Sequence, residues 1–346
     1  WVVKTALPWM LDIDKHSINA TRIFRELAII ESHKEAICEH IFNLLSIRNP
    51  ESMDSVFYDL SSTTLTGSRC VLMKWGHCKE GYRNHVVLAI VVNKDGLPFY
   101  WEVLPGGTAD ATTMVWLVDR LKKRFKTNNT TLVFDRGMVS DENLALLENE
   151  DPEIKYISAM DKSQINSITN VDFSNFSYFN SKNVEKQVCK LTNFRKLNDT
   201  TYYQEVKVEG RRRYILCFNP QLFKDQRKAR NQAVENFKFF TNSLNAELLD
   251  AKKSRQRKAT YKKFKHGITK FKLTSFVDVT LRVKHVIRKK ADGTEQKVRT
   301  YHGTVEVDEK SKQTAGELDG FWLLVTNHTE REKDSFSLSA QQAIAP

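Results

Sequence analysis

Cysteine is scarce in this chain, and the few cysteines lie far apart. The sequence contains five of them, with no pair in a CxxC spacing: Cys38, Cys70, Cys78, Cys189 and Cys217. An odd number of scattered cysteines is not expected to form a disulfide framework or a cysteine-based zinc site. The sequence therefore favours a reducing compartment, and we expect the cytoplasm.

Long hydrophobic runs are also missing. A membrane-spanning helix needs about 18 or more consecutive apolar residues. The longest candidates here, Val86–Val92 and Phe321–Val325, have the length of strands, so we expect no membrane partner. The chain has no signal-peptide pattern and no initiator methionine, and it stops abruptly at Pro346. We interpret it as a piece of a longer protein.

Acidic residues are fewer than basic ones. The 346 residues include 54 Lys and Arg against 42 Asp and Glu, which gives a net charge of +12. This balance excludes an acidic solvating protein and favours an anionic partner, with nucleic acid as the first candidate. The excess is concentrated in Lys252–Lys272, which holds ten Lys or Arg and no acid. The length allows roughly two domains.

The periodicity of the first 160 residues predicts an α/β fold. Residues 1–50 have helical spacing and are expected to form two helices packed as a small cap. Asp110 and Ser140 are each expected to cap a helix. The predicted strands are Val56–Leu60, His85–Val92, Leu97–Leu104, Thr130–Phe134 and Tyr156–Ala159. Three antiparallel strands followed by parallel αβ units are typical of the start of a ribonuclease-H-like sheet.

The remaining residues have a different pattern of strands and helices, and this pattern predicts an insertion. Alternating strands, one long helix at Phe223–Asp250 and a hairpin around Asp292–Gly293 indicate a basic, β-rich subdomain. Phe321–Thr326 then returns to the first sheet. We divide the chain into an N-terminal helical segment (1–50), the first part of the core (51–160), the insertion (161–318) and the return strand (319–346).

Two aspartates stand where strands end. Asp59 lies in the first predicted strand, and Asp135 follows the strand Thr130–Phe134. Carboxylates at strand ends of an α/β sheet converge at one edge, where ligands bind. Two such carboxylates suit Mg²⁺, which prefers oxygen ligands and retains waters and substrate phosphates. Each aspartate alone is equally well explained as a turn acid, but the pair in this element order favours a site.

The basic residues supply candidate contacts to DNA. Clustered Lys and Arg neutralise phosphates, and the aromatic residues among them, Tyr261, Phe264, His266 and Phe271, are expected to stack on bases. The alternative is a solvated amphipathic helix end. A zinc site at His77, Cys78 and His85 is rejected on spacing. The candidate DNA-binding residues are Arg83, Arg136, Arg211, Arg212, Lys252, Lys253, Arg255, Arg257, Lys258, Lys262, Lys263 and Lys265.

Three segments, taken in order, carry a family resemblance. YDLSSTTL (58–65), GYRNHVVLAIVVNKDGLPFYWEVLPGGTAD (81–110) and LVFDRGMVSDENLALL (132–147) resemble the core of bacterial insertion-sequence DDE transposases. In that group a β-strand insertion interrupts a ribonuclease-H-like fold. Asp319–Asn327 adds the D-G-x-x-x-x-x-T-N strand. Gly107 departs from the pattern, which often has Asn there, and Lys74–Arg83 fits it only partly.

The resemblance implies that Asp59 and Asp135 are the first two acids of a catalytic triad. Asp59 would bridge two Mg²⁺ ions, for which Mn²⁺ can substitute, and Asp135 would hold one of them. The third acid would be a glutamate in a Y-x-x-R-x-x-x-E-x-x-x-x-x-x-K helix after the return strand, and we expect it beyond Pro346. Glu330 and Glu332 are the nearest acids but lack the Tyr, Arg and Lys partners. The chain by itself is therefore expected to be inactive.

The function that this implies is DNA transposition. Such an enzyme cleaves transposon ends by metal-dependent phosphodiester hydrolysis and joins the 3′-hydroxyl to target DNA, and it acts as a homodimer on the terminal inverted repeats. One alternative is a catalytically inactive or domesticated DNA-binding protein. A second is a ribonuclease-H-like nuclease that cuts DNA without joining it.

Overall fold

The structure is a computed structural model that describes residues 7–10, 12, 14, 19–67, 69–125, 130–149, 154–169, 171, 173, 183–192, 194–289 and 293–328. The chain forms two compact units, residues 1–159 with 325–346 and residues 160–324. Both units combine helices and strands, so the predicted α/β class is confirmed. None of the helices in the described ranges has the length and apolar character needed to cross a membrane.

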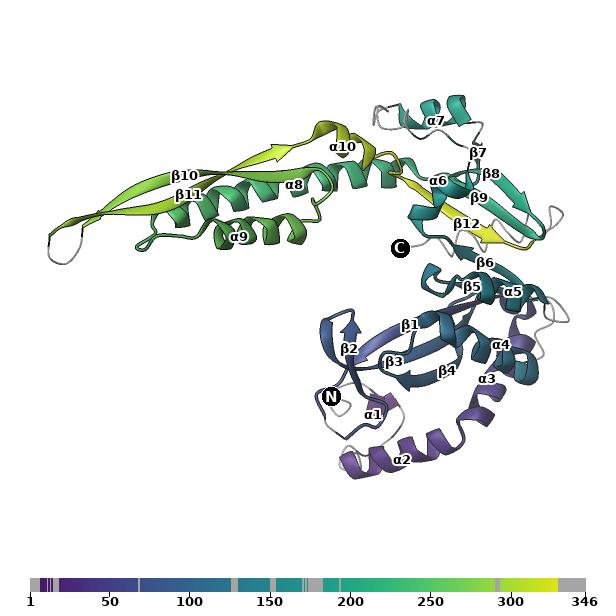
Figure 1. Ribbon diagram of the computed structural model, residues 1–346. Coiled ribbons are helices and arrows are strands. Elements are labelled where there is room, and N and C mark those ends of the chain that lie inside the picture. Colours follow the sequence, from purple (N-terminus) through teal and green to yellow (C-terminus); the bar gives the residue numbers. More distant parts are fainter. Residues whose placement is uncertain are drawn as a thin grey trace. The chain divides into compact units, whose positions relative to one another are not determined.

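The first unit is a mixed sheet with helices around it (Figure 1). Its elements are α1 (Leu7–Met10), α2 (Ala20–Ser32), α3 (Lys34–Arg48), η3 (Pro50–Met53), β1 (Ser55–Thr64), β2 (Lys74–Cys78), β3 (Gly81–Asn93), β4 (Pro98–Pro105), η4 (Asp110–Thr112), α4 (Thr113–Phe125), β5 (Thr131–Phe134), η5 (Arg136–Met138), α5 (Asp141–Asn149) and β6 (Lys155–Ala159). The predicted strands are all present, and β2 is an additional one.

The strand order of this sheet is that of a ribonuclease-H-like core. β3 pairs antiparallel with β1, and it also pairs antiparallel with β4 and β2. β5 runs parallel to β1, and β6 runs parallel to β5. The order β4-β3-β1-β5-β6 puts β1 and β5 in the middle of the sheet. All residues of β5 are buried, as expected for a parallel strand covered on both faces.

The helices of the first unit follow the predicted spacing except at the N-terminus. Met114, Leu117 and Leu121 lie on one face of α4 and are buried. Ser140 caps α5, because its Oγ accepts the Asn143 N–H at 3.1 Å. The expected packed pair of N-terminal helices is wrong, since no residue of α2 is buried. In α3, by contrast, Cys38 is buried.

The second unit contains a small sheet and a long hairpin with helices. Its elements are η6 (Lys162–Gln164), α6 (Ile165–Ile168), α7 (Val184–Thr192), β7 (Arg195–Lys196), β8 (Tyr202–Glu209), β9 (Arg212–Phe218), α8 (Pro220–Leu249), α9 (Arg257–Lys270), β10 (Val277–Lys289), β11 (Glu295–Val307), α10 (Glu309–Thr314) and β12 (Phe321–Thr326), whose last two residues belong to the first unit. β9 pairs with β8, and β8 with β7.

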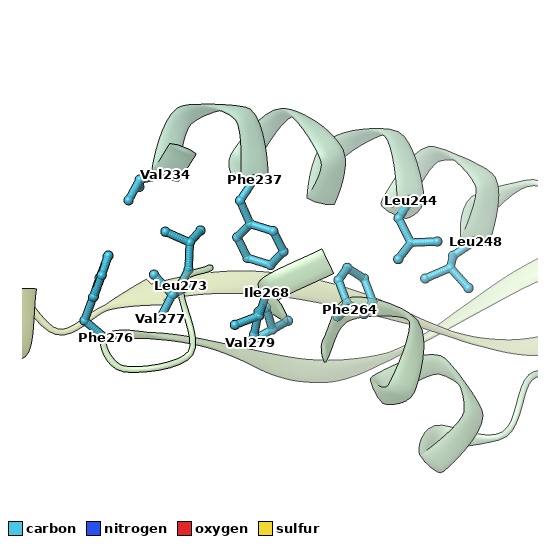
Figure 2. Close-up of a cluster of buried hydrophobic side chains, with 10 residues drawn as sticks. All are labelled: Val234, Phe237, Leu244, Leu248, Phe264, Ile268, Leu273, Phe276, Val277 and Val279. Atoms are coloured by element: carbon cyan, nitrogen blue, oxygen red, sulfur yellow. The ribbon is translucent and has the colours of Figure 1, made fainter. Parts of the chain in front are cut away.

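The hairpin β10–β11 lies beside α8 and α9 and has a hydrophobic core of its own (Figure 1). Figure 2 shows Phe237 and Leu244 of α8 facing Phe264 and Ile268 of α9, with Val279 of β10 on the same side. Phe237 and Phe264 are fully buried. The sequence predicts one long helix in this region, whereas the basic stretch forms a second helix because its apolar residues recur at helical spacing.

Candidate active site

The two predicted aspartates lie side by side at the centre of the first sheet. β1 and β5 are parallel, and Tyr58 is paired with Phe134. The residue after each of these two is an aspartate. Asp135 follows β5 as predicted, whereas the predicted strand-end position of Asp59 is wrong, because β1 continues to Thr64. Neighbouring strands are about 4.8 Å apart, and residues in register on parallel strands point to the same face. Both aspartates are exposed. The structure therefore brings Asp59 and Asp135 together.

A third carboxylate, that of Asp110, joins this pair. Burial raises the pKa of Asp110, and the charges of Asp135 and then Asp59 raise it further. Burial also raises the pKa of the neighbouring Tyr58 to about 12, to which the Asp110 and Asp59 charges contribute. We call Asp59, Asp110 and Asp135 the carboxylate group.

Asp110 is the member of this group whose role the sequence reasoning missed. The predicted helix cap is wrong, because Asp110 is the first residue of η4, whose N-cap is Ala109. The signal that could have found it is its place at the end of the P-G-G-T-A-D segment, between the two strand-end aspartates.

The turn after β5 fits closely around these carboxylates. Asp135 is the N-cap of η5, and its Oδ1 accepts the Arg136 N–H at 2.7 Å. A Cβ on Gly137 would lie 3.0 Å from Asp110 Oδ2. Glycine at position 137 therefore lets the Asp110 side chain approach the Asp135 turn.

The donor set of this site suits a hard divalent cation only in part. Asp59 and Asp135 supply carboxylate oxygens, the ligands that Mg²⁺ and Mn²⁺ prefer. In the described part of the chain, however, no three or more His, Cys, Asp or Glu residues are arranged to hold a metal ion. Asp59 and Asp135 therefore fit two ligands of such an ion, and the rest of its shell must come from water, substrate or other residues.

A buried histidine fixes the glycine turn that leads to Asp110. His85 Nδ1 donates to the Arg83 carbonyl, and Nε2 accepts the Gly107 N–H, each at 3.1 Å. Gly107 has φ +81°, and a Cβ on Gly106 would lie 2.1 Å from the His85 carbonyl oxygen. Both positions therefore require glycine. His85 is held by these bonds and is not part of a zinc cluster with His77 and Cys78.

The basic residues predicted near the carboxylates lie on the surface of the first unit. Arg83 of β3 is exposed, and its Nε donates to the Glu80 carbonyl at 3.4 Å. Arg136 is exposed and follows Asp135 directly.

The basic stretch of the second unit forms an exposed surface, which we call the α9 surface. All ten of its lysines and arginines are exposed, including the predicted Lys252, Lys253, Arg255, Arg257, Lys258, Lys262, Lys263 and Lys265. Lys263 Nζ pairs with Glu247 at 2.8 Å. Arg211 lies in the β8–β9 turn, and Arg212 begins β9.

The predicted stacking role of the aromatic residues is wrong for Phe264. This ring is fully buried in the hydrophobic core because it lies on the inner face of α9. Phe271 packs edge-on against Phe237 and Phe240. The Tyr261 hydroxyl donates to Asp278 at 3.0 Å. His266 is exposed.

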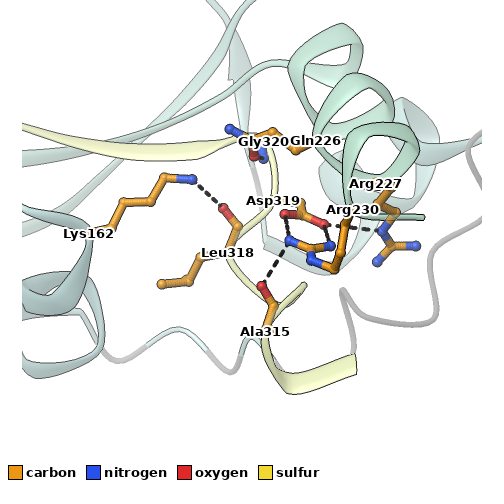
Figure 3. A network of polar contacts seen from close by, with 8 residues as sticks. All are labelled: Lys162, Gln226, Arg227, Arg230, Ala315, Leu318, Asp319 and Gly320. Atoms are coloured by element: carbon orange, nitrogen blue, oxygen red, sulfur yellow. Dashed lines mark hydrogen bonds and ion pairs between the residues drawn. The ribbon is translucent and has the colours of Figure 1, made fainter. Parts of the chain in front are cut away.

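The D-G motif before β12 has a structural role within the second unit. Figure 3 shows Asp319 held by two arginines of α8: Arg230 donates to both carboxylate oxygens at 2.6 and 2.7 Å, and Arg227 lies 3.6 Å away. Asp319 is buried. Gly320 has φ +75°, and a Cβ there would lie 2.7 Å from Phe223 Cβ. This motif therefore anchors the return strand to α8.

Some predictions concern residues that the structure does not describe. Glu330 and Glu332 lie outside the described ranges. The described thiols of Cys38, Cys70, Cys78 and Cys217 are free.

Comparison with known proteins gives a family match and distant structural similarity. No curated protein sequence matches the chain. The piggyBac transposase synaptic complex with hairpin DNA is 11% identical over 48% of this chain and 30% of that chain, with a TM-score of 0.28. The Mos1 mariner paired-end complex with Mn is 13% identical over 43% of this chain and 52% of that chain, with a TM-score of 0.22.

The family assignment rests on the sequence profile. The profile of the transposase DDE domain matches residues 54–258, which is more than half of the chain and includes Asp59, Asp110 and Asp135. The chain belongs to the transposase DDE domain family.

Proposed function

We propose that this chain is the catalytic part of a DNA transposase of the DDE class. It would cleave transposon ends by metal-dependent phosphodiester hydrolysis and join the new 3′-hydroxyl to target DNA. The observation that carries the proposal is the parallel register of β1 and β5, in which Asp59 and Asp135 follow paired residues. The raised pKa of Asp110 is consistent with it, because burial raises that pKa first and the charges of Asp135 and Asp59 raise it further.

The residues that would hold Mg²⁺ or Mn²⁺ are Asp59 and Asp135. Bound there, two such ions would activate the attacking oxygen and stabilise the leaving oxygen at phosphorus. Asp135 is prepared for this role by its bond to the Arg136 N–H, which fixes one carboxylate oxygen. Tyr58 and Phe134, both buried, hold the two strands in the register on which the pair depends. A third ligand from another part of the parent protein would complete the triad.

DNA is the proposed partner, and the α9 surface supports it. An exposed cluster of cations neutralises backbone phosphates without reading sequence. The terminal inverted repeats and the target would both be bound in this way, by a homodimer that holds two ends in one complex.

The second candidate function is a DNA-binding protein without catalytic activity. The observation that favours it is that the α9 surface stands on a hydrophobic core of its own, independent of the carboxylate group. The two candidates differ in whether a glutamate with Tyr and Arg partners follows the return strand in the parent gene. A nuclease that cuts without joining is distinguished by strand transfer.

The test is metal-dependent cleavage of a terminal inverted repeat by the full-length parent protein. The substrate is a labelled duplex that carries the end of the encoding element, incubated with Mg²⁺, Mn²⁺ or EDTA. Asp59→Asn and Asp135→Asn are compared with Asp54→Asn, an exposed aspartate of the same unit. We expect the wild-type protein to cleave and join DNA only when metal is present. We expect neither Asp59→Asn nor Asp135→Asn to do so. Undiminished cleavage by Asp59→Asn or Asp135→Asn would contradict the site.

A further inference from the structure

A cavity with both polar and apolar lining residues lies beside the carboxylate group, within the first unit. Its volume is ≈ 380 Å³, and Asp110 is part of its lining. Ser61 and Ser62 of β1 line it, together with His77 and Lys79 from the end of β2 and the turn that follows. Ser61 is two residues beyond Asp59 on the same face of β1, a step of about 7 Å along the strand. This is of the same order as one nucleotide of an extended DNA strand.

The lining contains hydroxyl and ammonium groups that can donate hydrogen bonds to a ligand. The Lys79 N–H donates to Ser62 Oγ at 3.2 Å, and Lys79 Nζ donates to Ser61 Oγ at 3.4 Å. Each serine hydroxyl accepts one of these bonds and keeps its own proton to donate. In the part of the chain that the structure describes, no carboxylate lies within ion-pair distance of Lys79, and neither hydroxyl proton has an acceptor.

One wall of this cavity is rigid. His85 and Gly107 both line it, and the bond from the Gly107 N–H to His85 Nε2 ties the glycine turn to β3. His85 is buried, and its second ring nitrogen is also bonded. The site is therefore formed before any ligand arrives, which lowers the entropic cost of binding.

We propose that this cavity binds a backbone phosphate of the DNA strand, next to the phosphate that the carboxylate group acts on. The inference rests on the proposed function and adds a subsite to it. A phosphate presents several acceptor oxygens and a negative charge, which match the two hydroxyls and the ammonium group. Asp110 repels an anion placed against it, so the contact is with Ser61, Ser62 and Lys79. Lys79 is a binding residue that positions the strand.

The first experiment locates bound DNA by photocrosslinking. The probe is an oligothymidylate of about twelve nucleotides with one central 4-thiothymidine, a length that suits single-strand sites. It is irradiated with the full chain in EDTA, and crosslinked peptides are mapped by mass spectrometry. We expect adducts in the segment that contains His77 and Lys79 as well as on the α9 surface.

Variants then test the subsite itself. Lys79→Gln should lower the yield of the cavity adduct by roughly fivefold or more, while adducts on the α9 surface stay unchanged. The matched control is Lys123→Gln, an exposed lysine of α4 paired with Asp119, which should change neither yield. A methylphosphonate beside the thiobase should lower the cavity yield in the wild type and have no further effect in Lys79→Gln.

The possible outcomes separate this inference from the proposed function. Adducts confined to the α9 surface would overturn the phosphate subsite and leave DNA binding in place. A cavity adduct that is indifferent to both Lys79→Gln and the methylphosphonate would also overturn it. The absence of any adduct would overturn DNA binding by this chain and the subsite with it.

Discussion

The carboxylate group and the α9 surface are two functional regions built in opposite ways. The carboxylate group depends on strand register and on a turn in which Gly106 and Gly107 allow no side chain. The α9 surface depends on a helix whose inner face is anchored by Phe264, while its lysines and arginines are exposed to solvent. Catalysis at phosphorus requires carboxylates in fixed positions, whereas binding of phosphates requires only a high density of positive charge on a stable support.

The largest expected effect separates activity from binding. In the parent protein, Asp135→Asn should lower the rate of end cleavage by more than about a thousandfold, because metal-ion catalysis contributes several kcal/mol of transition-state stabilisation. DNA affinity in EDTA should stay within about twofold of the wild type. Cleavage assays and fluorescence anisotropy measure the two quantities. A parallel loss of affinity would mean that the two regions are not separate.

The next largest effect concerns the hydrophobic core on which the α9 surface stands. Phe237→Ala should lower the opening free energy of the α8 and β11 amides by about 3–5 kcal/mol, since it leaves a cavity in the core. Phe239→Ala on the same helix should change it by less than about 0.5 kcal/mol, because that ring is 75% exposed. Native-state hydrogen exchange reports both values. Loss of protection in β1 and β5 to the same extent would show that the units do not open independently.

A smaller effect is expected from removing charge on the α9 surface. The triple variant Lys258→Gln, Lys262→Gln, Lys265→Gln should reduce the salt slope of duplex binding by about 2–3, because each phosphate contact contributes about 0.9. The control removes three exposed cations of α2 and α3, Arg22, Arg25 and Arg48, in the same way. Equal losses in the two triple variants would point to net charge alone and contradict a local surface.

The smallest effect is a gain in stability at the carboxylate group. The pKa of Asp110 is raised in the folded chain. The folded state therefore binds the proton more tightly than the unfolded state, and stability falls as pH rises through the folded pKa.

Asp110→Asn removes the free-energy cost of ionising this carboxyl group in the folded chain. It should raise the melting temperature by a few degrees at pH 7 in EDTA, and the gain should disappear below the ordinary Asp pKa of about 3.9. Asp54→Asn serves as the control and should show no such pH dependence. A gain for Asp110→Asn that persists at low pH would argue against the buried, ionised carboxylate as its cause.

The sequence predicts most of the framework because local patterns determine it. The buried run in β3, the apolar face of α4 and the Ser140 cap are each visible within a few residues. Asp59 and Asp135 could be predicted because Asp59 lies within a recognisable strand and Asp135 follows one. Asp110 could not, since a cap and a site carboxylate look alike in sequence, and the difference arises from packing against the distant Gly137.

Prediction from sequence has the same limit at the α9 surface. Its charge is evident from composition, but the inward position of Phe264 is not, because an aromatic residue among lysines fits both a stacking role and a core role. The structure decides between them through contacts with Phe237 and Val279, which come from other elements.

The two ends of the second unit lie close together in the structure. The Met160 N–H donates to the Leu323 carbonyl at 2.8 Å, so the first residue of this unit is hydrogen-bonded to the residue before its last one. A segment whose ends meet can be lengthened, exchanged or deleted with little change in the loop that the rest of the chain must close. The second unit can therefore change in length or sequence while the segments that contain Asp59 and Asp135 stay unaltered.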